Sequence, residues 1–155
     1  MNTFELKDQT VFSDSREATE MLGEALARAL RPGCVVALYG NLGAGKTVFA
    51  RGFARGLGIT DAVSSPTYTI VQEYPLPKEN GGYFYHLDLY RIADEHAALG
   101  FGADEFLDDP ASYALLEWPE RIQGILPPGR IAVTIRRLSE NEREIELKFP
   151  QVTDK

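Results

Sequence analysis

The sequence predicts an α/β fold with three layers, in which helices cover a mixed, mainly parallel sheet that ends in a C-terminal antiparallel hairpin. Strand patterns alternate with helical patterns along the chain, an order typical of layered α/β folds. Residues 34–39 form a short, continuous apolar run, which indicates a strand buried on both faces as in a parallel sheet. The alternating segments 130–138 and 143–149 flank a polar turn and indicate the hairpin.

The other elements follow from apolar periodicity. A capping-box pattern at Asp14–Glu17 begins a helix whose apolar residues recur every three or four positions until Pro32-Gly33 ends it. The further expected elements are an edge strand at 4–12, a helix at 46–57, strands at 67–74, 83–90 and 113–118, and one helix or two short ones at 93–107, broken near Gly100 and Gly102.

Length and composition limit the possible functions. A chain of 155 residues fits one domain, 1–155, and its balance of 44% hydrophobic and 25% charged residues is that of a globular protein. A net charge of −7 argues against a general nucleic-acid binder, so we expect a partner to hold any RNA involved. The single cysteine, Cys34, cannot form an internal disulfide. With no signal-peptide pattern and no apolar stretch long enough for a membrane, the sequence favours the cytoplasm and no membrane association.

Residues 40–47 form the strongest motif in the chain. Gly40-Asn41-Leu42-Gly43-Ala44-Gly45-Lys46-Thr47 fits the phosphate-binding pattern G-x-x-x-x-G-K-[ST], and it lies between an expected buried strand and an expected helix. The glycines let backbone N–H groups approach phosphate oxygens, and the positive N-terminus of the helix points at the anion. Lys46 would reach the β- and γ-phosphates and the Thr47 hydroxyl would bind Mg²⁺. The sequence therefore predicts a P-loop NTPase-like fold.

The loop motif itself does not distinguish between ATP and GTP. Guanine-specific proteins of this class usually carry Asn-Lys-x-Asp or Thr-Lys-x-Asp after a strand, and this sequence has neither. ATP with Mg²⁺ is therefore the favoured ligand.

Two carboxylates could orient the metal. Asp88 and Glu117 each end an apolar strand pattern, where an acidic residue can reach Mg²⁺ directly or through water. Strand alternation places His86 on the same face as Asp88, where it could position a water, tune Asp88, or serve only as a hydrogen-bonded histidine. Thr67, in Ser64–Thr67, either senses the γ-phosphate or belongs to an ordinary turn.

Several motifs together resemble one known family. The loop 40–47, Ser65–Tyr68, His86–Arg91 and Glu117-Trp118, in this order, are similar to the TsaE (YjeE) family of small bacterial ATPases needed to make threonylcarbamoyladenosine in tRNA. The resemblance runs from about Ser13 to Leu138. It implies a P-loop fold and action with TsaB and TsaD proteins. Because TsaD transfers the threonylcarbamoyl group, the resemblance implies that this chain contacts tRNA only indirectly, through the complex.

The same resemblance implies roles for individual residues. Thr47 and Glu117 correspond to the Mg²⁺ ligands, Asp88 to a residue essential for ATP hydrolysis, and Thr67 to a switch element. The family also places part of its nucleotide site at the start of the first helix, near Ser13 and Ser15. One departure is Val48, where the family loop often has a second threonine.

Two other functions are compatible with the loop. A small-molecule kinase can carry the same motif, although such kinases usually add a mobile, arginine-bearing lid, and no lid segment is evident here. A nucleotide-dependent binding module without turnover is the third alternative. A chain this small leaves few residues for a second substrate site, so we expect slow hydrolysis until a partner completes or exploits the site.

Overall fold

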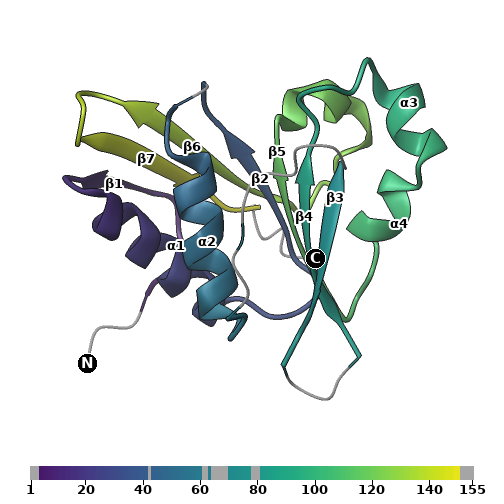
Figure 1. The fold of residues 1–155 in the computed structure, drawn as a ribbon, viewed down its shortest axis with the longest axis horizontal. Coiled ribbons are helices and arrows are strands. Elements are labelled where there is room, and N and C mark those ends of the chain that lie inside the picture. The colour runs from purple at the N-terminus through teal and green to yellow at the C-terminus, as the bar shows by residue number, and fades with distance from the viewer. Residues whose placement is uncertain (1–3, 42, 61–62, 64–69, 78–80, 151–155) are drawn as a thin grey trace, which may run out of the picture.

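The computed structural model describes residues 4–41, 43–60, 63, 70–77 and 81–150. Within them, one sheet of seven strands has the order β1-β7-β6-β2-β5-β4-β3 (Figure 1). The strands are β1 (Gln9–Ser13), β2 (Val35–Tyr39), β3 (Val71–Pro75), β4 (Tyr83–Asp88), β5 (Tyr113–Glu117), β6 (Ile131–Arg137) and β7 (Arg143–Lys148). The helices are α1 (Arg16–Ala29), α2 (Lys46–Gly56), α3 (Glu95–Gly100), α4 (Ala103–Leu107) and the 3₁₀ segment η1 (Pro119–Ile125).

The sheet is parallel in its centre and antiparallel toward its edges. Strands β6, β2, β5 and β4 pair in parallel, whereas β1–β7, β7–β6 and β3–β4 are antiparallel pairs. The expected mixed sheet and C-terminal hairpin are thus present. Because β1 adds to the hairpin and β3 turns back on β4, the parallel pairing is confined to the four central strands.

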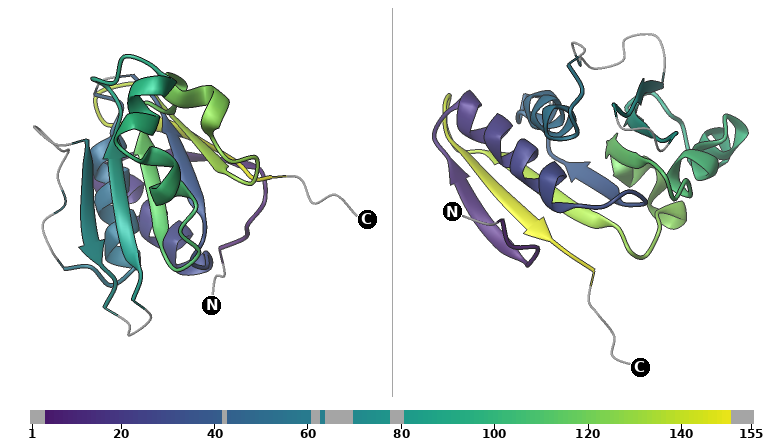
Figure 2. Two further views of the ribbon diagram at one scale, coloured as in Figure 1. Left: turned by 90° about the vertical axis from the view of Figure 1, so that its right-hand side faces the viewer. Right: turned by 90° about the horizontal axis from the view of Figure 1, so that it is seen from below.

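Helices cover both faces of the sheet, which gives the expected three layers (Figures 1 and 2). One apolar cluster joins α1 and α2 to the sheet, and its fully buried rings are Phe49, Phe53 and Phe84. A second cluster joins α3, α4 and η1 to the opposite face through residues such as Leu87, Leu116 and Ile122. Residues of β4 therefore alternate between the two faces, with Phe84 in the cluster of α1 and α2 and Leu87 in the cluster of α3, α4 and η1.

The helix pair α1–α2 packs at backbone contact distance. A Cβ atom at Gly52 would come within 1.9 Å of the Glu20 carbonyl oxygen, and one at Gly23 within 2.3 Å of the Phe49 carbonyl oxygen. Arg55 of α2 also pairs with Glu20 and Glu24 of α1. This contact fixes α2, and with it the loop that precedes α2.

Local boundaries differ from expectation at a few positions. Ser15, and not Asp14, caps α1, because Ser15 has extended backbone and its Oγ accepts the Ala18 N–H at 3.0 Å. The region 93–107 forms two short helices, and Gly102 between them has a φ of 90°. The expected strand 67–74 begins at Val71 as far as the structure describes it, since residues 67–69 lie outside the described part. η1 follows β5 directly and corresponds to no periodic pattern in the sequence.

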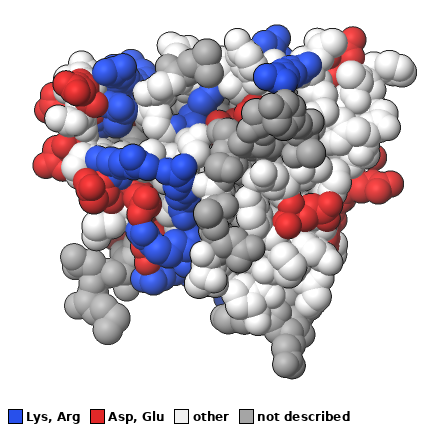
Figure 3. Space-filling view, in the orientation of Figure 1, with Lys and Arg blue, Asp and Glu red and all other residues white. Residues whose placement is uncertain are grey.

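No helix in the described part of the chain is long and apolar enough to span a membrane. On the face shown in Figure 3, basic and acidic side chains both gather over the half that carries α1 and α2. The described part of this face therefore has no broad surface of uniform positive charge.

Candidate functional site

The loop from β2 to α2 has the backbone that the glycine pattern predicts. Gly40 has a φ of 154° and a Cβ there would lie 2.8 Å from the Ile135 carbonyl oxygen, so a larger residue would push the loop off β6. Gly45 precedes α2 with a φ of 107°, a left-handed conformation that favours glycine. Lys46 begins the helix, so the positive end of its dipole opens onto the loop. Leu42 lies outside the described residues.

Arg143, at the start of β7, ties the C-terminal hairpin to this loop. Its Nε donates to the Ala44 carbonyl oxygen at 2.8 Å, and its Nη1 donates to the Ser139 carbonyl at 2.8 Å and to those of Glu140 and Glu142. The guanidinium thus holds the loop and the turn before β7 at once. No sequence motif points to this residue, because none marks the hairpin and the contact joins residues 99 positions apart.

Lys46 is buried without a hydrogen-bond acceptor. The residue is only 5% exposed, and in the described part of the chain its Nζ has no hydrogen-bond partner. Nζ instead lies 3.9 Å from the centroid of the Trp118 ring. Burial lowers the pKa of the amine, while the carboxylates of Glu117, Glu120 and Asp88 act in the opposite direction. A buried amine without a hydrogen-bond acceptor is suited to binding an anion.

The two candidate carboxylates stand side by side at the same edge of the sheet. Asp88 and Glu117 end the parallel neighbours β4 and β5 and are paired in register, and Leu89 donates its N–H to the Glu117 carbonyl at 3.0 Å. Glu117 is buried, whereas Asp88 is half-buried and its Oδ1 accepts the Tyr90 N–H at 3.1 Å. Burial raises the pKa of Asp88, and the nearby charge of Glu117 raises it further.

His86 contacts Glu117. Its Nε2 lies 2.7 Å from Glu117 Oε2, the imidazole is fully buried, and its ring stacks on Phe84 with centroids 6.2 Å apart. The expected shared face of His86 and Asp88 is confirmed, but the hydrogen bond links the histidine to the neighbouring strand.

Trp118 forms one wall of the site. In the described chain it is the only residue other than glycine with a positive φ, 61°. This turn at the end of β5 places the indole between Lys46 and Tyr90, whose ring centroid is 5.0 Å away. The guanidinium carbon of Arg121 lies over the Tyr90 ring, 5.9 Å from its centroid.

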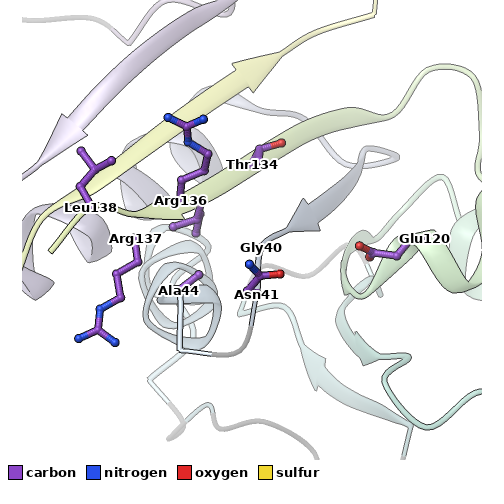
Figure 4. A pocket seen from close by; sticks show the side chains of 9 residues that line it. Gly40, Asn41, Ala44, Glu120, Thr134, Arg136, Arg137 and Leu138 are labelled. Atoms are coloured by element: carbon purple, nitrogen blue, oxygen red, sulfur yellow. The ribbon is translucent and has the colours of Figure 1, made fainter. Parts of the chain in front are cut away.

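Two hollows flank the loop. The first has a volume of about 520 Å³ and lies between the loop, Glu120 and β6 (Figure 4), where the side chains of Arg136 and Arg137 point in different directions. The second, of about 290 Å³, lies between the loop, the start of α1 and the turn before β7. Its lining residues are Ser15, Arg16, Thr19, Gly45, Val48, Glu140, Asn141 and Arg143.

The remaining predicted residues have the following positions. Thr47 lies in the first turn of α2, next to Lys46. Ser13 is buried behind the second hollow, where its Oγ donates to the Ser15 carbonyl at 2.8 Å and contacts Thr19 Oγ1 at 2.7 Å. Thr67 lies outside the described residues. The structure therefore gathers Lys46, Asp88 and Glu117 in one site and places Ser13 beneath its rim.

A family model described as threonylcarbamoyl adenosine biosynthesis protein TsaE matches residues 13–145. The chain belongs to the TsaE family. The match includes the whole loop 40–47, both carboxylates and Arg143. The family resemblance drawn from the sequence motifs is thereby confirmed.

Curated TsaE proteins and a solved structure extend the comparison. The chain is 43% identical to a tRNA threonylcarbamoyladenosine biosynthesis protein TsaE from Bacillus subtilis, over 91% of this chain and 84% of the relative. It is 36% identical to the TsaE protein of Treponema pallidum, over 86% and 95% of the two chains. The crystal structure of Bacillus subtilis YdiB matches 96% of this chain and 89% of its own, with a TM-score of 0.76 and 34% identity.

Proposed function

We propose that this chain binds Mg²⁺-ATP at the loop 40–47 and hydrolyses it in support of a TsaB–TsaD pair that makes threonylcarbamoyladenosine in tRNA. The observation that carries the proposal is the buried Lys46 amine, which has no hydrogen-bond partner in the described structure and lies at the N-terminus of α2. The β- and γ-phosphates of a nucleotide supply the acceptors that this cation lacks. The loop backbone and the helix dipole add further stabilisation for the same anion.

The position of the two carboxylates orients the nucleotide. Asp88 and Glu117 lie on the β4–β5 side of Lys46, so the γ-phosphate belongs there. The phosphate chain then leads away from them, toward Gly45 and Val48, and the nucleoside occupies the hollow of about 290 Å³ beside Ser15, Thr19 and Arg143. Ser13 supports this hollow from below through Thr19.

We assign the Mg²⁺ ligands to the Thr47 hydroxyl and the Glu117 carboxylate, as the family resemblance implies. Mg²⁺ bound there would neutralise negative charge on the phosphates. Asp88 is less buried than Glu117 and its pKa is raised, so its carboxylate is suited to orienting a water and accepting a proton from it. Thr67 is assigned as the switch residue from the resemblance alone.

The chain's size and charge support an auxiliary role. One domain holds the nucleotide site, and its net charge of −7 and the mixed charges of the face in Figure 3 favour contact with tRNA through protein partners. A cytoplasmic location fits a reaction on tRNA. Because TsaB and TsaD would complete or exploit the site, the isolated chain should hydrolyse ATP slowly.

The test is ATP hydrolysis by the purified chain with Mg²⁺, alone and with a TsaB–TsaD pair added. Lys46→Ala serves as the control, because it removes the cation without touching the carboxylates. A slow rate that rises with the pair supports the proposal. A rate that ignores the pair, but rises with a small hydroxylated metabolite that becomes phosphorylated, would instead indicate a kinase.

A further inference from the structure

We infer that His86 is a positioning residue that fixes the Glu117 carboxylate for the cation. The inference rests on the proposed function, since it assigns Glu117 to Mg²⁺. The contact itself is a feature of the fold and exists whether or not a nucleotide binds. His86 Nε2 and Glu117 Oε2 are 2.7 Å apart, and both residues are buried.

The chemistry of the pair defines which atom donates. With the carboxylate oxygen as the acceptor, the Nε2–H group donates the hydrogen bond to Oε2. In the described part of the structure the other ring nitrogen, Nδ1, is buried without a partner. A ring with its hydrogen on Nε2 presents a lone pair at Nδ1 and leaves no N–H donor unpaired there. The geometry therefore favours the Nε2–H tautomer.

The ring is held in place independently of Glu117. Its plane is 9° from that of Phe84, on which it stacks, and β4 pairs with β5 so that His86 lies opposite Leu115. A donor that is fixed by packing on one strand thus engages one oxygen of a carboxylate on the next strand. This contact leaves Glu117 Oε1 as the oxygen for the cation.

Asp88 has a different support. Its Oδ1 accepts the backbone N–H of Tyr90, two residues along its own chain. The two neighbouring carboxylates are therefore held by separate donors, one from a side chain and one from the backbone. Loss of the His86 donor would free Glu117 to turn toward the Lys46 ammonium, which its charge already influences.

Three variants separate positioning from packing. His86→Phe keeps an aromatic ring on Phe84 and removes the donor. His86→Gln removes the ring but places an amide N–H donor near the position of Nε2. His96→Phe is the matched control, because His96 is the other histidine of the chain and is exposed.

The first readout is the cation affinity of the nucleotide-loaded protein. Mn²⁺, a paramagnetic substitute for Mg²⁺, is titrated into protein in excess over a non-hydrolysable ATP analogue and followed by electron paramagnetic resonance. His86→Phe should weaken Mn²⁺ binding by about 10–100-fold, the usual effect of losing a residue that supports a metal ligand. Analogue affinity in EDTA should change by less than about threefold. His86→Gln should recover most of the Mn²⁺ affinity, and His96→Phe should match the wild type.

The second readout needs no ligand. In the nucleotide-free protein labelled with ¹⁵N-histidine, the His86 ring should show the Nε2–H tautomer, and Glu117→Gln should shift its Nε2–H signal while the His96 signals stay in place.

Unchanged Mn²⁺ affinity in a folded His86→Phe, or equal losses in His86→Phe and His86→Gln, would overturn the inference. If His86→Phe does not fold, an Nε2–H signal unaffected by Glu117→Gln overturns it. If the wild type binds no ATP analogue, the proposed function fails, while the ¹⁵N result still decides the contact.

Discussion

Lys46 is the residue at which burial and charge conflict most directly. The residue is only 5% exposed and its amine lies over an indole ring, and its pKa is lowered because burial outweighs the nearby carboxylates. A group whose pKa is lowered in the folded state destabilises that state while it is protonated. The phosphate-binding loop therefore keeps a cation that reduces the stability of the nucleotide-free protein.

Replacing Lys46 with Met should separate stability from binding. Methionine has similar length, keeps contact with Trp118 and removes the buried charge. We expect the nucleotide-free variant to melt roughly 2–4 °C higher, the shift produced by about 1 kcal/mol in a domain of this size. ATP affinity, measured by isothermal titration, should fall about 10–100-fold because a charged hydrogen-bond donor is lost. Unchanged ATP affinity would remove Lys46 from the site.

Cys34 offers a pH prediction at the same scale. Burial raises the pKa of its thiol from 9.0 to about 12. The folded state therefore holds this proton where the unfolded state has lost it, so the thiol's contribution to stability is complete below pH 9 and declines as the pH rises from 9 toward 12.

Because the thiolate is the reactive species, alkylation of native Cys34 by iodoacetamide at pH 9 should be at least about 100-fold slower than in urea. Mass spectrometry of the labelled chain measures both alkylation rates. The alkylation rate of a short peptide with an exposed cysteine, measured in the same two solutions, is the reference for each. Equal rates in the native and the unfolded protein would show that the thiol is accessible and ionised.

At the scale of elements, α1 and α2 cross at backbone contact distance. Gly52 allows α2 to touch the backbone of α1, since a Cβ there would lie 1.9 Å from the Glu20 carbonyl oxygen. Gly52→Ala must push the helices apart and should cost about 3 kcal/mol of unfolding free energy. Urea denaturation measures this loss.

Gly100→Ala is the control for that substitution. Gly100 ends α3, and a Cβ there meets no atom within 4 Å. Alanine is also the better helix former, so this variant should be unchanged or more stable by up to about 1 kcal/mol. If both glycines tolerate alanine equally, close approach is not what requires Gly52.

The elements that were predictable from the sequence are those that local patterns define. The apolar runs at β2, β4 and β5 and the glycine loop are local patterns, so the central strands, α2 and the grouping of Lys46, Asp88 and Glu117 followed from them. The His86–Glu117 bond, the Lys46–Trp118 contact and η1 depend on which strands become neighbours and how a chain turns at a positive φ. Local periodicity does not say which strands pair or where the chain turns. It also does not decide which of the adjacent polar residues Asp14 and Ser15 caps α1.

At the scale of the whole molecule, segments from the first and last parts of the described chain lie side by side at the site. β1 pairs with β7, α1 begins beside the second hollow, and the turn before β7 reaches the phosphate-binding loop through Arg143. The C-terminal hairpin carries no recognisable motif, yet it forms part of the same rim as Ser15 and Thr19. Its role in the site comes from the antiparallel extension of the sheet beyond β6.

Arg143→Met tests whether this long-range contact organises the loop. The change removes the donors to Ala44 and to the turn carbonyls, so the loop loses an anchor and must be ordered by the nucleotide itself. ATP affinity should fall roughly tenfold, equivalent to about 1.4 kcal/mol. Arg143→Lys should recover only part of this loss, because an ammonium lacks the fork of donors that reaches two segments at once.

Arg28→Met is the matched control, since it removes an equal charge from an exposed α1 residue that pairs with Glu24. Its ATP affinity should equal that of the wild type, as measured by the same titration. If Arg143→Met and Arg28→Met bind ATP equally well, the loop is ordered by its own glycine geometry and the helix, and the hairpin contributes only to the stability of the sheet. A loss confined to Arg143→Met would instead show that the last two strands are part of the nucleotide site.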